Sequence, residues 1–135
     1  MENTRNEFLD NFVDMCRREE EANRFKVVTI CSSSRFRHRI PEIKKELTMQ
    51  GYIVLDPILF DTGIDHDANF VKNNKSMLVE MHRRRILMSD LIYVVNVDGY
   101  IGEGVQHEID FAIEHGKGVM LLEYDDRFVK SAGDE

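Results

Sequence analysis

The sequence predicts an α/β protein with a flavodoxin-like parallel sheet of strand order 2-1-3-4, helices on both faces and room for a fifth strand. Short apolar runs alternate along the chain with longer amphipathic segments. The runs are continuous and rich in β-branched residues, which is typical of strands covered on both faces. A chain of 135 residues, 42% of them apolar, provides for one core and therefore for a single domain.

These patterns predict four strands and four helices. The strands are expected at residues 25–31, 52–60, 91–97 and 118–124. The helices are expected at residues 3–21, 37–50, 76–90 and 103–115. The polar residues 61–75 are expected to form a loop, and a loop of this length in a compact domain favours a functional loop or a lid.

Proline, glycine and serine residues mark the expected ends of these elements. The second strand is expected to break at Pro57, because proline cannot donate to the ladder. Pro41 fits the second helix only within its first turn. Gly51 and Gly116 suit helix C-termini, and Ser76 is the expected N-cap of the third helix.

The chain divides into three parts around this sheet. Residues 1–24 form an amino-terminal helical extension, residues 25–124 form the α/β core, and residues 125–135 form a tail that is expected to be loose or to lie on the surface. Phe8 and Phe12 share one face of the extension. That face either contacts another copy of the chain or covers the protein's own sheet.

The composition excludes several classes of function. A net charge of −7 argues against a nucleic-acid polymer as partner, although a small anionic ligand can still bind a locally positive site. Cys16 and Cys31 are too few for a disulfide framework and indicate reduced thiols in a cytoplasmic protein. The sequence contains neither an apolar run long enough to span a membrane nor the features of a signal peptide, so no membrane association is expected.

The predicted topology brings two unusual loops together. In an open parallel sheet, ligands bind outside the carboxyl ends of the strands where the winding reverses, which is here between strands one and three. The loops that leave these strands are residues 32–36 ("SSSRF") and 98–104 ("DGYIGEG"). We therefore expect a ligand crevice between these two loops.

The first loop has the composition of an anion site. Its serines, Ser32, Ser33 and Ser34, precede a predicted helix N-terminus, where free N–H groups favour an anion, and Arg35 can add a bidentate clamp. The alternative is that Ser34 only caps the helix and Arg35 is solvated. In the second loop, Gly99, Gly102 and Gly104 permit close approach of the backbone to a ligand, or form a plain glycine turn.

Glu108 is the candidate reactive group. Val105, Ile109 and Ala112 mark the inner face of the helix over residues 103–115, and Glu108 lies at the margin of that face. A carboxylate beside a ligand crevice can attack the anomeric carbon of a sugar or stabilise an oxocarbenium ion. The alternative is a partly buried salt bridge from Glu108 to Arg83 or Arg85.

The histidines predict no metal site. The pair His107-Glu108 begins a zinc-protease motif, but Phe111 occupies the position of the second histidine. The acidic residues 61–67 lack the calcium-loop pattern, so we predict neither a metal nor a cofactor. His82 either faces the crevice or is structural, and the basic residues 82–86 form a solvated face, an interface or part of an anion site.

Three segments together give a family resemblance: "TICSSSRF", "LVEMHRRRILMSDLIYVVNV" and "GYIGEGVQHEIDFAIEHGKGVMLLE". They resemble the nucleoside 2-deoxyribosyltransferase superfamily, which includes the 2'-deoxynucleoside 5'-phosphate N-hydrolases. The resemblance covers about residues 26–123. It implies a flavodoxin-like fold and an enzyme that cleaves or transfers the N-glycosidic bond of a (deoxy)nucleoside or its monophosphate.

The resemblance also implies roles for particular residues. Glu108 matches the family nucleophile, which attacks C1' of the nucleoside. The segment 31–35, Cys31 included, matches the hydrolases' sugar and phosphate contacts. Asp98 matches a second acid that orients the sugar and the nucleophile. His82 stands where the family has an aspartate that assists departure of the base, and a histidine can also act as a general acid near neutral pH. Gly102 stands where the hydrolases have a phosphate-contacting serine.

Two further functions remain open beside this enzyme. His82 in place of aspartate, and the missing serine, are also compatible with a non-catalytic nucleotide-binding sensor. The amphipathic extension and residues 82–86 are compatible with an interaction protein. For the enzyme, the expected partners are a small nucleoside or nucleotide and further copies of the chain, because family members commonly form dimers or larger assemblies.

Overall fold

The computed structural model describes residues 2–128, without the side chains of residues 2–5 and 21–23. Its sheet contains four parallel strands in the order β2-β1-β3-β4, which confirms the predicted topology; no fifth strand occurs among these residues. The strands are β1 (Val27–Cys31), β2 (Ile53–Leu55), β3 (Leu91–Val94) and β4 (Gly118–Leu121). The tail residues 129–135 lie outside the described part of the chain.

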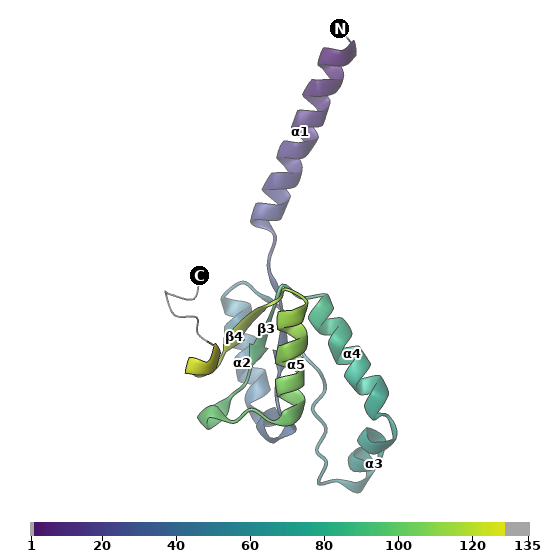
Figure 1. Cartoon of the computed structure of the whole chain (residues 1–135), viewed down its shortest axis with the longest axis vertical. Helices are drawn as coiled ribbons and strands as arrows, with labels where there is room; N and C mark the ends of the chain where they lie inside the picture. The colour runs from purple at the N-terminus through teal and green to yellow at the C-terminus, as the bar shows by residue number, and fades with distance from the viewer. Residues whose placement is uncertain (1, 129–135) are drawn as a thin grey trace.

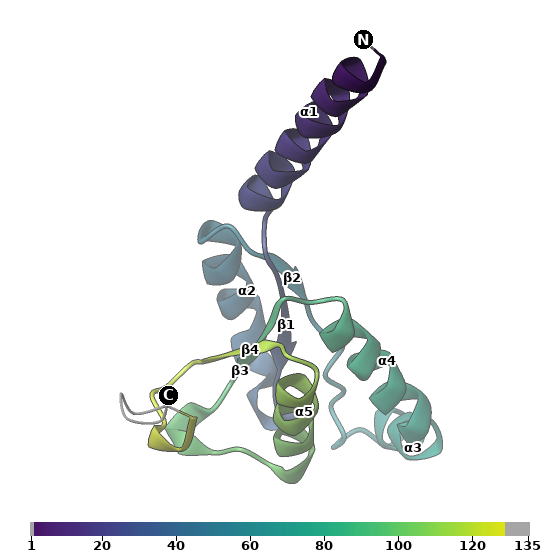
Figure 2. The same ribbon diagram turned by 45° about the horizontal axis from the view of Figure 1, so that its top comes forward.

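Helices cover both faces of this sheet. The α-helices are α1 (Glu2–Asn23), α2 (Ile40–Met49), α3 (Asp65–Asn73), α4 (Lys75–Leu87) and α5 (Glu103–Glu114). Helix α2 lies on one face of the sheet, and α4 and α5 lie on the other (Figure 2). Within the described residues, no helix is long and apolar enough to cross a membrane.

The core consists of two layers, because successive strand residues point to opposite faces of a sheet. Val28 and Ile30 of β1 pack with the apolar side of α2. Cys31, the last residue of β1, belongs to the other layer, where it packs with Ile86 of α4 and Ile109 of α5. The end of β1 therefore touches the helices that carry the candidate site residues.

The predicted elements are present, but several of their ends differ from the prediction, and β3 and β4 each stop three residues before the expected ends at 97 and 124. Helix α2 begins at Ile40 with Pro41 in its first turn, and a 3₁₀ helix, η1 (Ser34–Arg39), precedes it. The segment 61–75 is not only a loop, since it contains α3. Ser76 is not the N-cap of α4, because that helix begins at Lys75 after Asn74.

Helix α1 stands apart from the rest of the molecule. It projects away from the sheet and covers no part of it (Figures 1 and 2). The alternative in which this helix covers the protein's own sheet is therefore wrong. Its apolar side chains Phe8 and Phe12 are 69% and 51% exposed. The connection to β1 is held by Arg24, which forms an ion pair with Asp90 at 2.6 Å.

Candidate functional site

Glu108 lies where β1, α4 and α5 meet. It projects from the second turn of α5, and its side chain is 28% exposed. Its Oε2 atom is 3.4 Å from Nε2 of His82, a residue of α4 whose side chain is 8% exposed. The Sγ atom of Cys31 lies 3.4 Å from the same histidine nitrogen. Three predicted site residues, distant in sequence, are thus in contact.

Two adjoining cavities open beside this cluster. The first has a volume of about 300 Å³ and lies between α4 and α5, and it is lined by Lys75, Val79, His82, Arg83, Glu103, Gly104, His107, Glu108 and Phe111. The second, of about 220 Å³, extends toward the end of β1 and is lined by Ser32, Pro57, Leu59, Val71, Lys75, Leu78, Val79, His82 and Glu108. His82 and Glu108 line both, so any ligand in either cavity lies beside them.

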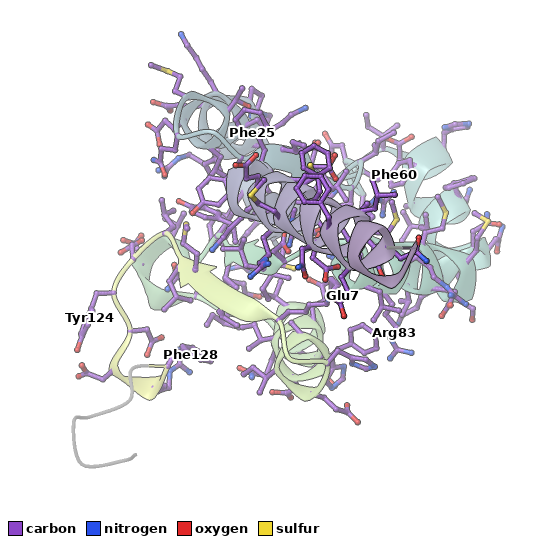
Figure 3. All side chains as sticks on the ribbon, turned by 90° about the horizontal axis from the view of Figure 1, so that it is seen from above. Glu7, Phe25, Phe60, Arg83, Tyr124 and Phe128 are labelled. Carbon is purple, nitrogen blue, oxygen red and sulfur yellow. The ribbon has the colours of Figure 1, made fainter. Side chains whose placement is uncertain are left out.

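The carboxylate of Glu108 presents its two oxygens differently. Oε2 is buried and has no hydrogen-bond partner of acceptable geometry among the described residues. Because Oε2 is buried while part of the side chain is exposed, Oε1 is the oxygen that a ligand can reach. No salt bridge joins Glu108 to Arg83 or Arg85 in the described residues; its ion-pair partner is His82, at 3.4 Å, which carries a charge only when the imidazole is protonated. Arg83 instead lies over the ring of Phe111 at 5.5 Å, on the side of α4 that faces α5 (Figure 3).

The Cys31 thiol is inert in this setting. It is fully buried, and burial raises its pKa well above the ordinary value; the negative charge of Glu108 raises the pKa further. A protonated, buried thiol is a poor nucleophile. Cys31 therefore does not fit the role of a reactive cysteine, although it is in contact with a histidine.

The two predicted loops do lie side by side, as the topology requires. Arg35 stacks over the ring of Tyr100 at 3.7 Å, and Phe36 meets the same ring edge-on at 5.9 Å. The arginine is therefore placed on the second loop and not in either cavity beside Glu108. Ser33, not Ser34, caps the following 3₁₀ helix, by accepting a hydrogen bond from the N–H of Arg35 at 3.3 Å.

The remaining residues of the second loop divide between the cavity and the surface. Gly104 lines the first cavity, whereas Asp98, Gly99 and Gly102 line neither of the two. Asp98 and Gly99 both have positive φ, of 54° and 76°, so they form a tight turn. The N–H of Asp98 donates to the carboxylate of Glu123 at 2.6 Å, which ties this turn to the chain after β4.

Comparisons of the chain with protein-family models, with curated proteins and with solved structures found no match. The site is therefore interpreted from its own geometry. The assignment to the nucleoside deoxyribosyltransferase superfamily stays a prediction that rests on the segments quoted above.

Sequence reasoning missed several residues that line the cavities. Lys75 and Val79 precede His82 by seven and three positions, so all three fall on one side of a helix. On α5, Phe111 lies three positions after Glu108, and His107 lies four positions before Phe111. Helical spacing from His82 and Glu108 could have identified Val79, Lys75 and Phe111. Lys75 was not assigned to a helix because residues 61–75 were expected to form a loop.

Proposed function

We propose that this chain cleaves or transfers the N-glycosidic bond of a nucleoside or nucleoside monophosphate, with Glu108 as the nucleophile. The observation that carries the proposal is the position of Glu108, which lines both cavities at the carboxyl end of β1 and has its buried oxygen against His82. Two joined cavities beside one carboxylate suit a substrate made of two parts, a base and a sugar.

The proposed reaction uses Glu108 in two steps. Oε1 attacks C1' of the sugar, so that a C1'–O bond forms as the C1'–N bond to the base breaks and the base leaves with a proton. A water molecule or a second base then attacks C1' and releases the Glu108 carboxylate, and its proton passes to the imidazole that protonated the departing base. The first acceptor gives a hydrolase and the second a transferase.

The proton for the departing base comes from a neighbouring imidazole in this proposal. His82 is 3.4 Å from the nucleophile, whereas the acid and nucleophile of retaining glycosidases are about 5–5.5 Å apart. His82 therefore has to move away from Glu108 by roughly 2 Å to reach the base. If His82 does not move, it only orients the carboxylate of Glu108. The proton donor is then His107, which lines the first cavity.

Positive groups beside the cavities support an anionic substrate. Lys75 lines both cavities and Arg83 lines the first, so two cations lie near Glu108 in a protein of net charge −7. They are the groups that can hold a phosphate in this proposal. Arg35 is stacked on Tyr100 and would have to leave that ring to contribute.

The proposal is tested by chromatography of the free base released from a panel of deoxynucleosides, ribonucleosides and their 5'-monophosphates. The substitution Glu108→Gln keeps the shape of the side chain and should lower the rate at least about 1000-fold. Asp110→Asn is the matched control, because Asp110 lies on the same helix with its side chain bonded to Gln106. Equal release by the parent chain and Glu108→Gln would reject the proposal.

A non-catalytic nucleotide sensor is the second candidate. The short separation between His82 and Glu108 favours it, because these groups are too close to flank a glycosidic bond as they stand. In this case nucleotides should raise the melting temperature without any release of base. The same panel of ligands therefore separates the two functions.

We also propose that the chain forms a homo-oligomer through α1 and acts in the cytoplasm. The exposed apolar face of α1 supports the assembly, because a helix that packs against nothing gains little stability from its own sequence. The alternative is that this face binds a different protein, as it would in a scaffold or interaction protein. The cytoplasmic location rests on the two unpaired thiols.

A further inference from the structure

Three different metal-binding side chains meet behind the cavities. The Sγ atom of Cys31, the Nε2 atom of His82 and a carboxylate oxygen of Glu108 all lie within 4.8 Å of one another. We propose that these three atoms bind one Zn²⁺ ion, with a fourth position open to the cavity beside Glu108. The three residues come from β1, α4 and α5, which are regular elements that fix the ligands before an ion arrives.

The spacing of the atoms fits a tetrahedral zinc ion. Zinc bonds of about 2.3 Å to sulfur and about 2.0–2.1 Å to nitrogen or oxygen place neighbouring ligand atoms roughly 3.3–3.6 Å apart. The distance from Sγ to Nε2 is 3.4 Å, and the distance from Nε2 to Oε2 of Glu108 is also 3.4 Å. Two of the three distances between the ligand atoms therefore already have the length that a shared ion requires.

The direction of the contacts favours an ion over a proton relay. In a cysteine–histidine–acid relay, the nucleophile and the acid contact different nitrogens of the imidazole. Here Cys31 and Glu108 both approach Nε2, and Nδ1 is buried without a partner among the described residues. Three donor atoms that converge on one point form a coordination site, and this set does not form a relay.

A second observation supports a cation between these three atoms. Oε2 of Glu108 is buried and lacks a hydrogen-bond partner within the part of the chain that the structure describes. Buried carboxylate oxygens are nearly always paired, because an unpaired one loses its hydration without compensation. A zinc ion between Oε2, Sγ and Nε2 would satisfy this oxygen, and it would bind Cys31 as the thiolate with release of the thiol proton to solvent.

The ligand set selects the metal. Thiolate and imidazole together favour zinc over magnesium and calcium, which prefer oxygen ligands. Three protein ligands with an open position are typical of sites where zinc also holds a water molecule. A zinc ion on Oε2 would withdraw electron density from the carboxylate and make Oε1 a weaker nucleophile. The zinc-bound chain is thus the less active form of the enzyme proposed above.

Cobalt titration of the full-length, chelator-treated chain tests this site without any nucleoside present. We expect one Co²⁺ per chain, a thiolate-to-cobalt charge-transfer band, and displacement of that cobalt by Zn²⁺. Cys31→Ser should abolish the charge-transfer band, and His82→Gln and Glu108→Gln should each weaken zinc binding at least about tenfold. Cys16→Ser is the matched control and should leave the band unchanged.

The proposal is overturned if no charge-transfer band forms, or if the band survives Cys31→Ser and disappears with Cys16→Ser. It is also overturned if Glu108→Gln binds zinc as tightly as the parent chain. Circular dichroism shows whether each variant is folded; if Cys31→Ser is not, the other two substitutions decide. A negative result in this titration would not count against the proposed release of base, because base release is measured separately and without added metal.

Discussion

Asp90 binds the connection between α1 and β1. Its carboxylate accepts two hydrogen bonds from Arg24, at 2.6 and 3.1 Å, and one from the N–H of Val27 at 2.8 Å. The Arg24 side chain, and next the Val27 N–H, hold the pKa of Asp90 below its ordinary value. The charged form of Asp90 is therefore the form that stabilises the fold.

Asp90→Asn should lower the free energy of unfolding at pH 7 by roughly 0.5–1 kcal/mol, because it removes a charge from hydrogen bonds that are partly exposed and screened by solvent. The folded-state pKa lies below the unfolded value of about 3.9, so this contribution is complete above that value. It is lost as the pH falls through the folded-state pKa. Urea unfolding of both chains from pH 7 downward measures the effect, and a difference independent of pH would contradict it.

The two cysteines should react very differently with a thiol reagent. Cys31 is buried with a raised pKa, whereas Cys16 is partly exposed on α1. The native chain should therefore show one fast thiol, and a second should appear only when urea unfolds it. Cys16→Ser should remove the fast reaction. Fast reaction of that variant would show that Cys31 is accessible.

Residue-scale reasoning from sequence succeeded where a helix fixed the direction of a side chain. The position of Glu108 on the flank of Val105 and Ile109 placed it at the margin of the core, where it lies. The contact of Cys31 with His82 could not be predicted, since the two are 51 positions apart. Its geometry depends on how closely α4 packs on the end of β1.

At the scale of elements, Asn96 joins the chain after β3 to the chain after β4. Its side-chain amide donates to the carbonyl of Glu123 at 2.9 Å and accepts from the N–H of the same residue at 2.8 Å. Asn96 is fully buried. This clamp holds the turn that contains Asp98 and Gly99 at the carboxyl edge of the sheet.

Asn96→Leu should lower the free energy of unfolding by about 1–3 kcal/mol, because the backbone groups of Glu123 lose both partners. Asn96→Asp should cost more, since it buries a carboxylate whose second oxygen faces the carbonyl of Glu123, to which it cannot donate. Thermal and urea unfolding of the three chains test this order. A leucine variant as stable as the parent would show that the clamp contributes nothing.

Among the strands and α-helices of residues 2–128, only α3 was not predicted from the sequence. Its nine residues include few apolar ones and none that are buried, so the sequence shows no clear helical repeat of apolar residues there. Asp65 and Asp67 lie in its first turn, where they favour the helix dipole, but acidic residues are equally common in loops. The start of α4 was misplaced for the same reason, because Lys75 follows this helix after a single residue.

At the scale of the whole molecule, the sequence predicted the sheet because parallel topology follows from the order of elements. Alternation of strands and helices, with right-handed crossovers, leaves few arrangements, and the order 2-1-3-4 is the simplest of them. The placement of α1 could not be derived in this way. An amphipathic helix predicts that one face is covered, but not whether the covering surface belongs to the same chain.

The described part of the chain leaves that face uncovered. Phe8 and Phe12 are exposed on a helix that stands away from the sheet (Figure 1). Helices of this kind are marginal in water unless they pack against something. A second copy of α1 offers a matching apolar face at the same concentration as the first, so self-association is the simplest way to cover both.

If the chain self-associates through α1 as proposed, Phe8→Glu combined with Phe12→Glu should give a monomer of 15.8 kDa, with a loss of helical circular dichroism from α1. Arg17→Gln combined with Arg18→Gln is the matched control, because it changes the net charge equally at exposed polar positions of the same helix. Light scattering coupled to size-exclusion chromatography gives both masses. If the control stays oligomeric, the effect of the two glutamates comes from the lost apolar contact and not from the added negative charge. A parent chain that is already monomeric would show that α1 serves a different partner.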